Sequence, residues 1–394
     1  MASSLPPHTS PLTVLHVASG DRWAGAEAQL HTLLTHLNKR DDIQARAVLL
    51  NEDETAERLR ASGVSVDVLD ESRLNGLRIF LDLRRLLRRY QPHVIHTHRQ
   101  KENVLAGLAN ATTLRAPCAR TVHGAPEHAP PWIQLHKHLF RWLDLAVGCY
   151  LQDRVIAVSR DLQDRLSAIF PRGKVTLVNN GVDIESIVAM ATHPAEFRLT
   201  HPQHRHIGLV GRLEPVKRGD IFLMMAALLC RENLPWPLRF HIFGDGSLRA
   251  SLEAQAKMLN LGDSVRFHGY RKDISVCMAS LDVLLVCSDH EGLPMTVLES
   301  VVLGTPVVAH RVGGLAEVLD DSSGGMLVRQ HDPRDYAQAV LEMLFSPSKA
   351  NECVRNGQNR IERYYSADVN AENMVKIYFD FLLGYKPRDL LRNR

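Results

Sequence analysis

The sequence has few cysteines and no long apolar run. None of its six cysteines forms a C-x-x-C pair; they stand at positions 118, 149, 230, 277, 287 and 353. Scattered thiols of this kind exclude a disulfide scaffold and are typical of a reducing compartment. The longest apolar run, "IFLMMAALLC", has ten residues and is too short to cross a bilayer. The polar, proline-rich start "MASSLPPHTSPL" is not typical of a signal peptide. We therefore expect a cytoplasmic protein.

Three further absences narrow the range of possible functions. The net charge of +3 is too small to indicate a nucleic-acid-binding protein. The loop "GDRWAGAEAQL" after the first expected strand contains no G-x-G-x-x-G, which weakens a dinucleotide-binding hypothesis. No D-x-D pair occurs, although paired aspartates are the usual way to hold a divalent ion on a sugar diphosphate. We therefore predict neither a metal nor a cofactor.

The basic charge is unevenly distributed. The segment 84–101 contains six lysines or arginines and no acidic residue. This pattern fits either a solvated helix face or contact with an anionic membrane surface or acceptor. The amphipathic segment "IQLHKHLFRWLDLAVGCYL" (133–151) favours a peripheral contact with an anionic membrane at its inner, cytoplasmic face.

Short β-rich runs alternate with helical patterns along the whole chain. Such alternation predicts parallel sheets covered by helices on both faces. A chain of 394 residues also exceeds the length that one core usually supports. We expect strands in the first half at 12–18, 45–50, 64–69, 93–98, 119–124, 153–159 and 174–180, and in the second half at 206–211, 238–244, 263–269, 281–287, 305–310 and 324–328. The predicted α/β organisation comprises an N-terminal domain at 1–185, a linker at 186–205, a C-terminal domain at 206–365 and a final helical segment at 366–394.

The stretch "SDHEGLPMTVLES" places two glutamates, Glu291 and Glu299, eight positions apart. Pro294 fits the start of a helix, where its missing N–H would have no partner, and the apolar run 295–302 continues that helix. Eight positions span roughly 12 Å at 1.5 Å per residue, close to the length of a sugar diphosphate with its ribose. Because the unpaired N–H groups of a helix start bind phosphate, this spacing favours a nucleotide sugar laid along the helix start.

Two cations follow the strand expected at 206–211. Arg212 and Lys217 lie in "GRLEPVKRGD", on a loop that enters a helix. Two cations beside a helix start can hold a diphosphate without a metal. The alternative interpretation is a pair of solvated loop cations.

Histidines offer a second set of candidates. His123 lies at the end of the strand expected at 119–124, where it could donate a hydrogen bond to a sugar hydroxyl or accept one. Because the chain has twenty histidines, a structural role is the alternative. His96 and His98 share one face of a strand, but further ligands at suitable spacing are missing, so the sequence does not favour a zinc site.

Glycines follow two of the expected strands. Gly25 lets the backbone approach a ligand closely. Gly313 and Gly314 in "RVGGLAEVL" could offer backbone N–H groups to sugar hydroxyls.

Five motifs, taken in order, resemble those of the retaining glycosyltransferases of family four: "GRLEPVK", "FGDGSLR", "FHGYRKD", "SDHEGLPMTVLES" and "VGGLAEVL". The resemblance runs from the first strand to about residue 365. It implies the GT-B fold, in which two Rossmann-like, doubly wound domains face a cleft and the C-terminal helix crosses back to the first domain. In one place the chain departs from the family, which often has two glycines where this sequence has Ala24–Gly25.

The resemblance also assigns roles to residues. It implies that Glu299 binds the ribose hydroxyls, that Glu291 lies beside the transferred sugar and that His123 lies by the sugar and the acceptor. Arg212 and Lys217 would hold the diphosphate. The other implied donor-binding residues are Gly25, Tyr270, Arg271, Gly292, Leu293, Pro294, Gly313 and Gly314.

The function implied is retaining, metal-independent transfer of a hexose-type sugar from a nucleotide-diphosphate sugar, UDP favoured over GDP. The acceptor would be a saccharide or lipid-linked molecule in cell-envelope, exopolysaccharide or lipopolysaccharide biosynthesis. Two alternatives remain open. An epimerase of the same fold would interconvert the donor without an acceptor, and a non-catalytic nucleotide-sugar-binding protein would bind the donor without turnover.

Overall fold

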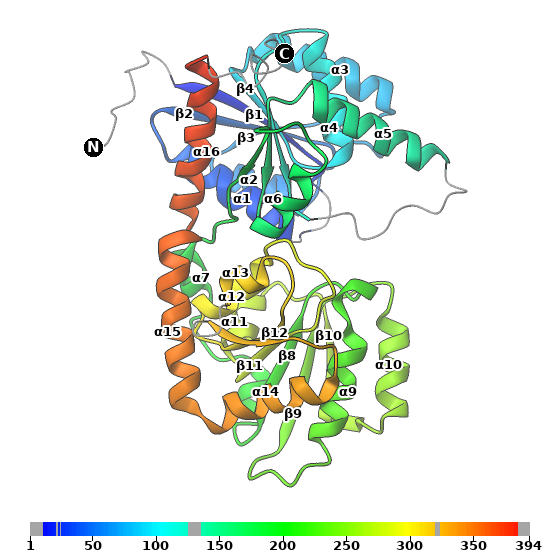
Figure 1. The fold of residues 1–394 in the computed structure, drawn as a ribbon, viewed down its shortest axis with the longest axis vertical. Coiled ribbons are helices and arrows are strands. Elements are labelled where there is room, and N and C mark those ends of the chain that lie inside the picture. The colour runs from blue at the N-terminus through cyan, green and yellow to red at the C-terminus, as the bar shows by residue number, and fades with distance from the viewer. Residues whose placement is uncertain (1–10, 21–22, 24, 125–134, 320–323, 385–394) are drawn as a thin grey trace. The chain divides into compact units, whose positions relative to one another are not determined.

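The computed structural model describes residues 11–384 except 21–22, 24, 125–134 and 320–323. The chain divides into two compact units (Figure 1). Unit 1 comprises Met1–Gly181 and Ala367–Arg394, and unit 2 comprises Val182–Ser366. Each unit has its own parallel sheet and its own buried apolar clusters, so each is described separately.

The sheet of unit 1 has seven parallel strands in the order β3-β2-β1-β4-β5-β6-β7. Their near-continuous apolar sequences suit strands that are covered on both faces. The strands are β1 (Leu12–Ala18), β2 (Ile43–Leu49), β3 (Ser65–Val68), β4 (Val94–Thr97), β5 (Cys118–Val122), β6 (Arg154–Ala157) and β7 (Val175–Leu177).

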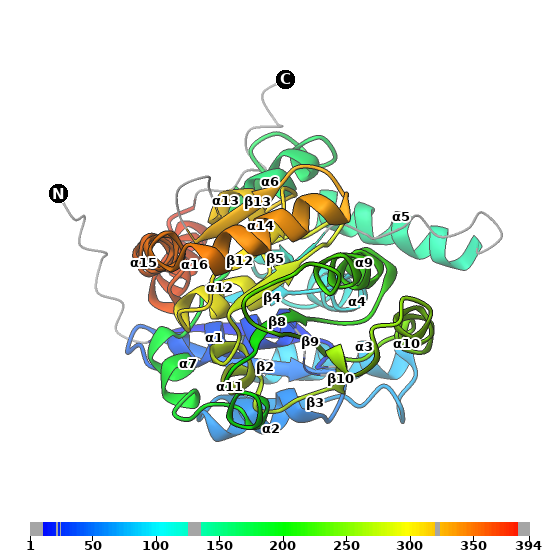
Figure 2. The same cartoon turned by 90° about the horizontal axis from the view of Figure 1, so that it is seen from below.

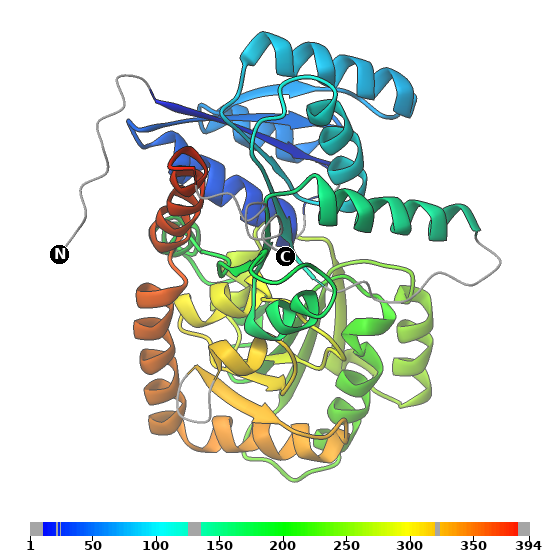
Figure 3. The ribbon, with the colours of Figure 1, turned by 45° about the horizontal axis from the view of Figure 1, so that its top comes forward.

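Helices cover both faces of this sheet. They are α1 (Gly25–Asn38), α2 (Glu54–Ala61), α3 (Gly76–Tyr90), α4 (Gln100–Ala111), α5 (Leu135–Tyr150), α6 (Arg160–Ser167) and α16 (Ala367–Leu382). Side-chain caps fix several helix starts, since the Asn75 carbonyl accepts from the Arg78 N–H and the Ser159 hydroxyl accepts from the Leu162 N–H. On one face α16 packs against α1, while α3, α4 and α5 lie next to one another on the other (Figure 3).

The C-terminal helix supplies part of the core of unit 1. Met374, Tyr378 and Phe381 of α16 are buried in the same apolar cluster as Leu30 and Leu34 of α1. The residues that end the chain therefore complete the unit with which the chain begins.

The sheet of unit 2 has six parallel strands in the order β10-β9-β8-β11-β12-β13. The order reverses between β8 and β11, as it does between β1 and β4 in unit 1, and ligands of doubly wound sheets bind beyond the carboxyl ends of the strands at this point. The strands are β8 (Arg205–Val210), β9 (Leu238–Phe243), β10 (Val265–Gly269), β11 (Val283–Val286), β12 (Val307–His310) and β13 (Gly325–Val328).

Helices also lie on both faces of the unit 2 sheet (Figure 2). They are α7 (Ile184–Met190), α8 (Glu196–Thr200), α9 (Gly219–Leu229), α10 (Arg249–Met258), α11 (Ile274–Ala279), α12 (Met295–Val302), α13 (Leu315–Val318), α14 (Pro333–Phe345) and α15 (Pro347–Tyr364), with short 3₁₀ turns at Pro215–Lys217 and Gly262–Ser264. None of the helices within the described ranges combines the length and the apolar character needed to span a bilayer.

The segment 186–205, predicted as a linker, contains most of α7 and all of α8. Hydrogen bonds tie it to the rest of unit 2, since the Ala195 N–H donates to the Ser280 hydroxyl at 2.7 Å and Arg198 pairs with Asp282 at 2.8 Å. Helices of seven and five residues make too few turns to show a helical period in the sequence.

Candidate active site

The carboxyl ends of β8 and β11 bring a cation and a carboxylate together in unit 2. The Lys217 ammonium, just past β8, donates to Glu291 Oε1 at 2.6 Å. Glu291 lies in the loop after β11, and the Ser288 hydroxyl of that loop donates to the same oxygen at 2.6 Å. The Lys217 and Glu291 side chains are only 23% and 10% exposed. Because both donors hold one carboxylate oxygen, the orientation of Glu291 is fixed before any ligand binds.

The helix α12 begins directly after this loop, at Met295, and ends at Val302, as predicted. Pro294 is its N-cap residue, and within the described residues this cap makes no side-chain hydrogen bond to the helix start. The partial positive charge of this helix start is therefore open to an anion.

Glu299 lies one turn into α12 and has a different environment from Glu291. The residue is partly buried, and burial raises the pKa of its carboxyl group to about 7. Within the described residues no side chain or backbone group is hydrogen-bonded to this carboxylate. It is therefore an acceptor that a ligand with hydroxyl donors can satisfy.

Two glycines, Gly313 and Gly314, pack against the backbone of the loop that contains Glu291. A Cβ on Gly313 would lie 1.9 Å from the Glu291 carbonyl oxygen, and a Cβ on Gly314 would lie 2.0 Å from the Gly292 carbonyl oxygen. The Gly314 N–H already donates to the Gly292 carbonyl at 2.9 Å. This differs from the sequence expectation, in which that N–H was a donor to a sugar hydroxyl, because close packing of the two loops takes the N–H first.

The other predicted residues of unit 2 lie around the same strand ends. Arg212 follows β8 and is exposed. Hydrogen bonds from Ser247 are the main cause that lowers the pKa of Glu214; burial raises this pKa, and the positive charge of Arg212 lowers it by a smaller amount. Arg271, after β10, is paired twice with Asp273, at 2.8 and 2.6 Å. Its neighbour Tyr270 is 51% exposed.

Sequence reasoning missed two residues of this site. Ser288 fixes Glu291, and Arg218 pairs with Asp289 at 3.0 Å and with Asp220 at 3.0 Å, which joins the two loops. The signal was present, because Ser288 and Asp289 directly follow the strand predicted at 281–287.

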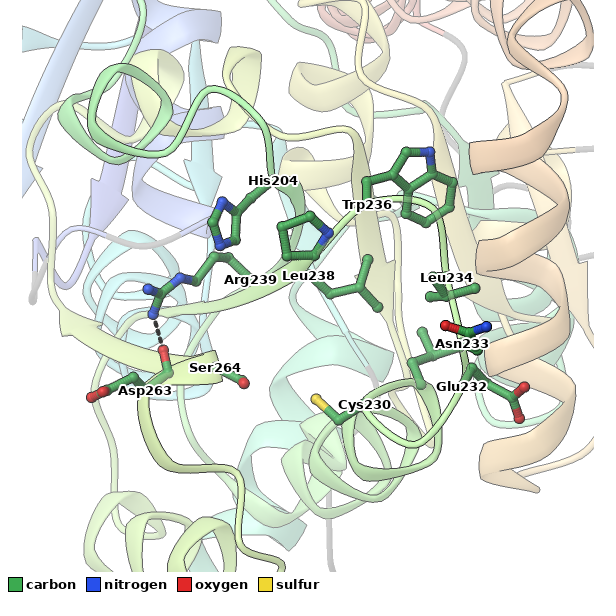
Figure 4. Close-up of a pocket in the computed structure, with 12 residues that line it drawn as sticks. His204, Cys230, Glu232, Asn233, Leu234, Trp236, Leu238, Arg239, Asp263 and Ser264 are labelled. Atoms are coloured by element: carbon green, nitrogen blue, oxygen red, sulfur yellow. Dashed lines mark hydrogen bonds between the residues drawn. The ribbon is translucent and has the colours of Figure 1, made fainter.

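A hollow of about 490 Å³ lies at the opposite edge of the unit 2 sheet (Figure 4). It is lined by residues that precede or begin strands, among them His204, Trp236 and Arg239, and the Arg239 guanidinium donates to the Asp263 carbonyl there. The amino ends of parallel strands are not the usual ligand edge, so this hollow is separate from the Glu291 site.

In unit 1, His123 does not stand alone. Its Nε2 lies 3.2 Å from His98 Nδ1, and His98 Nε2 lies 3.0 Å from Nδ1 of His16 on β1. The sequence did not single out His16, although β1 places it beside His96 in the sheet. Burial lowers the pKa of His16 and of His98 well below the usual value and that of His123 to about 4.

His16, His96 and His98 are close enough together to raise the zinc question again. The rings of His96 and His98 are parallel within 9°, with centroids 4.6 Å apart, and those of His16 and His98 are parallel within 22°. A lone pair of imidazole lies in the ring plane, so the lone pairs of the parallel His96 and His98 rings do not converge on one ion. His16 Nδ1 and His98 Nε2 are hydrogen-bonded to each other at 3.0 Å, which leaves no room for an ion between them. The residues present do not fit a metal.

The remaining predicted residue of unit 1 is Gly25, the first residue of α1. Gly25 follows the loop after β1, and its neighbour Ala24 lies outside the described residues. Gly25 and His123 therefore belong to unit 1, and all other predicted site residues belong to unit 2.

Comparison with known proteins identifies the class. Residues 23–186 match the model of glycosyltransferase family 4, and residues 196–360 match that of the glycosyl transferases group 1. The chain belongs to the family-four glycosyltransferases, and its fold of two Rossmann-like domains is GT-B. The predicted family and fold class are confirmed.

Relatives extend over different shares of the chain. The UDP-Gal:alpha-D-GlcNAc-diphosphoundecaprenol alpha-1,3-galactosyltransferase of Escherichia coli is 24% identical over 91% of this chain and 97% of its own length. A D-inositol 3-phosphate glycosyltransferase of Streptosporangium roseum is 32% identical, but over 45% of this chain and 43% of its own length. The crystal structure of Anabaena HepE in complex with UDP-glucose has a TM-score of 0.79 at 20% identity, covering 93% of this chain and 99% of that one.

Proposed function

We propose that this glycosyltransferase moves a hexose from a UDP-sugar, in preference to a GDP-sugar, to a saccharide or lipid-linked acceptor, with retention of configuration and without a metal. The carrying observation is the row of groups in unit 2: a cation paired with Glu291, the open start of α12, and the unpartnered carboxylate of Glu299. The donor and acceptor named for the Escherichia coli galactosyltransferase, and the UDP-glucose of the HepE complex, support this choice of substrates.

Each group has a role that suits its environment. Glu299 would accept hydrogen bonds from the ribose hydroxyls. Lys217, Arg212 and the start of α12 would stabilise the diphosphate. Glu291 is already held by Lys217 and Ser288, so we assign it to orienting the sugar and balancing its charge, and not to attack as a nucleophile.

The remaining assignments concern the periphery of the donor. Tyr270 and Arg271 would border the base, and His123 and Gly25 would approach the donor from unit 1. The loop residues Gly292, Leu293 and Pro294 would contact the sugar and the diphosphate through their backbone. We propose that residues 1–185 form the acceptor side and residues 206–365 the donor side.

The mechanism follows from where charge develops. As the glycosidic C–O bond to the diphosphate breaks, negative charge accumulates on the β-phosphate and the sugar becomes oxocarbenium-like. Cations and helix N–H groups stabilise that charge more in the transition state than in the ground state, which lowers the barrier. The acceptor oxygen attacks from the face that the diphosphate leaves, and its proton passes to the departing phosphate oxygen, which retains the anomeric configuration.

The test is release of nucleotide from panels of UDP- and GDP-sugars in the presence of excess EDTA. We expect release that is faster with a UDP-sugar and unaffected by the chelator, and an α-linked product from an α-linked donor by proton NMR. Loss of turnover in EDTA, an inverted product, or interconversion of the donor without an acceptor would each contradict the proposal.

We further propose that unit 1 contacts an anionic membrane from the cytoplasmic side. Leu139, Phe140 and Trp142 of α5 are 68%, 37% and 66% exposed, and Arg85 and Arg88 are exposed on α3. Both helices pack against α4, on one side of unit 1 (Figure 3). Exposed apolar side chains next to cations are typical of helices that lie in a membrane interface.

A further inference from the structure

The histidines of unit 1 form one continuous hydrogen-bonded chain. It runs from His123 to His98 at 3.2 Å and from His98 to His16 at 3.0 Å, and it ends at the hydroxyl group of Tyr378, which lies 3.4 Å from His16 Nε2. Tyr378 belongs to α16 and is fully buried. The same hydroxyl lies 2.6 Å from His96 Nδ1, and His96 Nε2 lies 2.8 Å from the Thr121 hydroxyl.

The direction of the hydrogen bonds along this network can reverse, because the groups at its ends can either donate or accept. A neutral imidazole has one N–H and one lone pair, whereas a hydroxyl group can donate or accept. When Tyr378 donates to His16, every histidine of the chain carries its proton on Nδ1, and His123 Nδ1 is a donor. When Tyr378 accepts from His16 and donates to His96, each of the three carries its proton on Nε2, and His123 Nδ1 is an acceptor.

A second histidine chain, in unit 2, cannot reverse. His268 Nε2 lies 2.9 Å from His241 Nδ1, and His241 Nε2 lies 2.9 Å from His206 Nδ1. This chain ends where His206 Nε2 meets the His201 carbonyl at 3.1 Å. A carbonyl only accepts, so His206 carries its proton on Nε2, and the same nitrogen is protonated along the chain.

The free end of the unit 1 chain is His123 Nδ1. This atom is buried and has no hydrogen-bond partner among the described residues. A buried polar atom without a partner is unfavourable, and a bound molecule with a hydroxyl group would satisfy the atom by donating to it or accepting from it.

The chain is also unsuited to storing a proton. The pKa of His123 is lowered by burial first and then by the positive charge of Arg99, and burial alone raises the pKa of the Tyr378 hydroxyl. Protonating the histidines or ionising the tyrosine is therefore unfavourable, and the chain has two neutral arrangements.

We propose that His16, His98 and Tyr378 are positioning residues that couple the tautomers of the chain, so that His123 Nδ1 recognises one hydroxyl group of the substrate as either a donor or an acceptor. This inference rests on the proposed function for the identity of that substrate. It assigns no acid–base step to His123, because its role is hydrogen bonding in the neutral form.

The coupling itself is tested without turnover, by long-range ¹H–¹⁵N NMR of the full chain labelled at histidine. We expect His16, His98 and His123 to be neutral at pH 6.5 and to carry their protons on the same nitrogen, in the free protein and with UDP-glucose. His206, His241 and His268 should all carry the proton on Nε2. Protons on different nitrogens in neighbouring histidines of the unit 1 chain, or an imidazolium there, would overturn the proposal.

The effect on recognition is tested by a double-mutant comparison. First, His123→Phe is assayed with UDP-glucose and its monodeoxy analogues; the analogue whose kcat/KM it leaves unchanged identifies the hydroxyl that His123 contacts. His98→Phe, which keeps the stacked ring and removes both nitrogens, should then lower kcat/KM about tenfold or more for UDP-glucose and less than about threefold for that analogue.

The matched control is His241→Phe in the middle of the unit 2 chain. His241 is 3% exposed and His98 is 6% exposed, so the two substitutions should perturb packing alike, and His241→Phe should leave kcat/KM unchanged. Equal losses for His98→Phe with every donor would show a purely structural role and overturn the proposal. Absence of nucleotide release in the parent protein would instead contradict the proposed function, and the NMR experiment would still decide the coupling.

Discussion

At the scale of single residues, the proposed mechanism depends most on Lys217. Its ammonium neutralises Glu291 in the free protein and would stabilise the leaving diphosphate during reaction. We expect Lys217→Ala to lower kcat about 10²- to 10³-fold, the effect of removing one donor to developing charge. Lys257→Ala on the exposed end of α10 is the control, and nucleotide release measures both. Equal rates for the two variants would remove Lys217 from the mechanism.

Glu299 predicts a pH dependence of stability. Its folded-state pKa of about 7 lies above the ordinary value of 4.5, so between these pH values the folded state binds more protons than the unfolded state. Stability therefore falls as pH rises through this window, by at most about 3 kcal/mol, because one pKa unit is equivalent to 1.36 kcal/mol. We expect urea unfolding of the parent protein to show this fall relative to Glu299→Gln. A difference between the two that stays constant from pH 5 to 8 would contradict it.

Residue types and spacing predicted the start of α12 after Pro294, which is confirmed. They also indicated Glu291, Glu299 and Lys217, because these residues follow from strand ends and helix rise, and the roles of the three stay predictions. Residue types and spacing were not enough to predict the hydrogen bond from Ser288 to Glu291 or the contact of Lys217 with Glu291. Those contacts depend on how two loops 74 residues apart in sequence pack side by side, and short-range patterns carry no information on that packing.

At the scale of elements, the loop of Glu291 is held by backbone contacts that allow no side chain. Gly314 has an ordinary backbone φ of −65°, so Gly314→Ala adds no backbone strain but brings a Cβ into the Gly292 carbonyl and against the Leu293 side chain. We expect this substitution to destabilise the protein by about 1–3 kcal/mol and to slow nucleotide release by displacing Glu291. Unfolding and turnover assays measure the two effects.

The control for that substitution is Gly76→Ala at the start of α3, where a Cβ meets nothing within 4 Å. It should leave turnover unchanged and not lower the free energy of unfolding, because alanine favours the helix. If Gly314→Ala behaves like Gly76→Ala, the loop contact does not position Glu291.

The exposed side chains of α5 give a prediction for the same scale. We expect the parent protein to float with vesicles that contain anionic lipid at low salt, and Trp142→Ala with Phe140→Ala to reduce the bound fraction several-fold, because aromatic side chains at the interface supply the apolar part of binding. Met258→Ala, an exposed apolar change on α10 in unit 2, is the matched control. Binding that is insensitive to both salt and these substitutions would exclude this face.

Long and strongly periodic elements were readily predicted, and the 186–205 segment was not. All thirteen expected strands are present, and α12 has the expected bounds. Buried parallel strands and apolar helix faces each give a recognisable hydrophobic pattern in the sequence. The helices α7 and α8 are short. Hydrogen bonds to Ser280 and Asp282 hold α8, and α7 packs against α11 and α12, so tertiary packing decides their structure.

At the scale of the whole molecule, one unit is built from a single segment of the chain and the other from two segments. Unit 2 is one continuous segment, Val182–Ser366, whereas unit 1 needs both ends of the chain. Tyr378 and its neighbours on α16 fill the core of unit 1 and close its histidine network. The family resemblance implied this return of the C-terminal helix, but the pairing of Tyr378 with His16 and His96 required the register of β1 and β4, which a sequence pattern does not specify.

This unequal division predicts different fates for isolated fragments. A fragment of residues 182–366 retains its complete sheet and core, so we expect it to fold cooperatively and to bind UDP, the part of the donor assigned to unit 2, with no transfer activity. At a UDP concentration a hundred times Kd, its free energy of unfolding should increase by about 2.7 kcal/mol.

A fragment of residues 1–181 lacks α16 and exposes the apolar surface that Met374 and Phe381 cover, so we expect it to remain unfolded or to aggregate. Circular dichroism and calorimetry measure folding, and titration calorimetry measures UDP binding with Glu299→Gln in the same fragment as the control. A folded 182–366 fragment that binds no UDP would show that the nucleotide site is not built from unit 2 alone, because its α12 start, Lys217 and Glu299 would all be present.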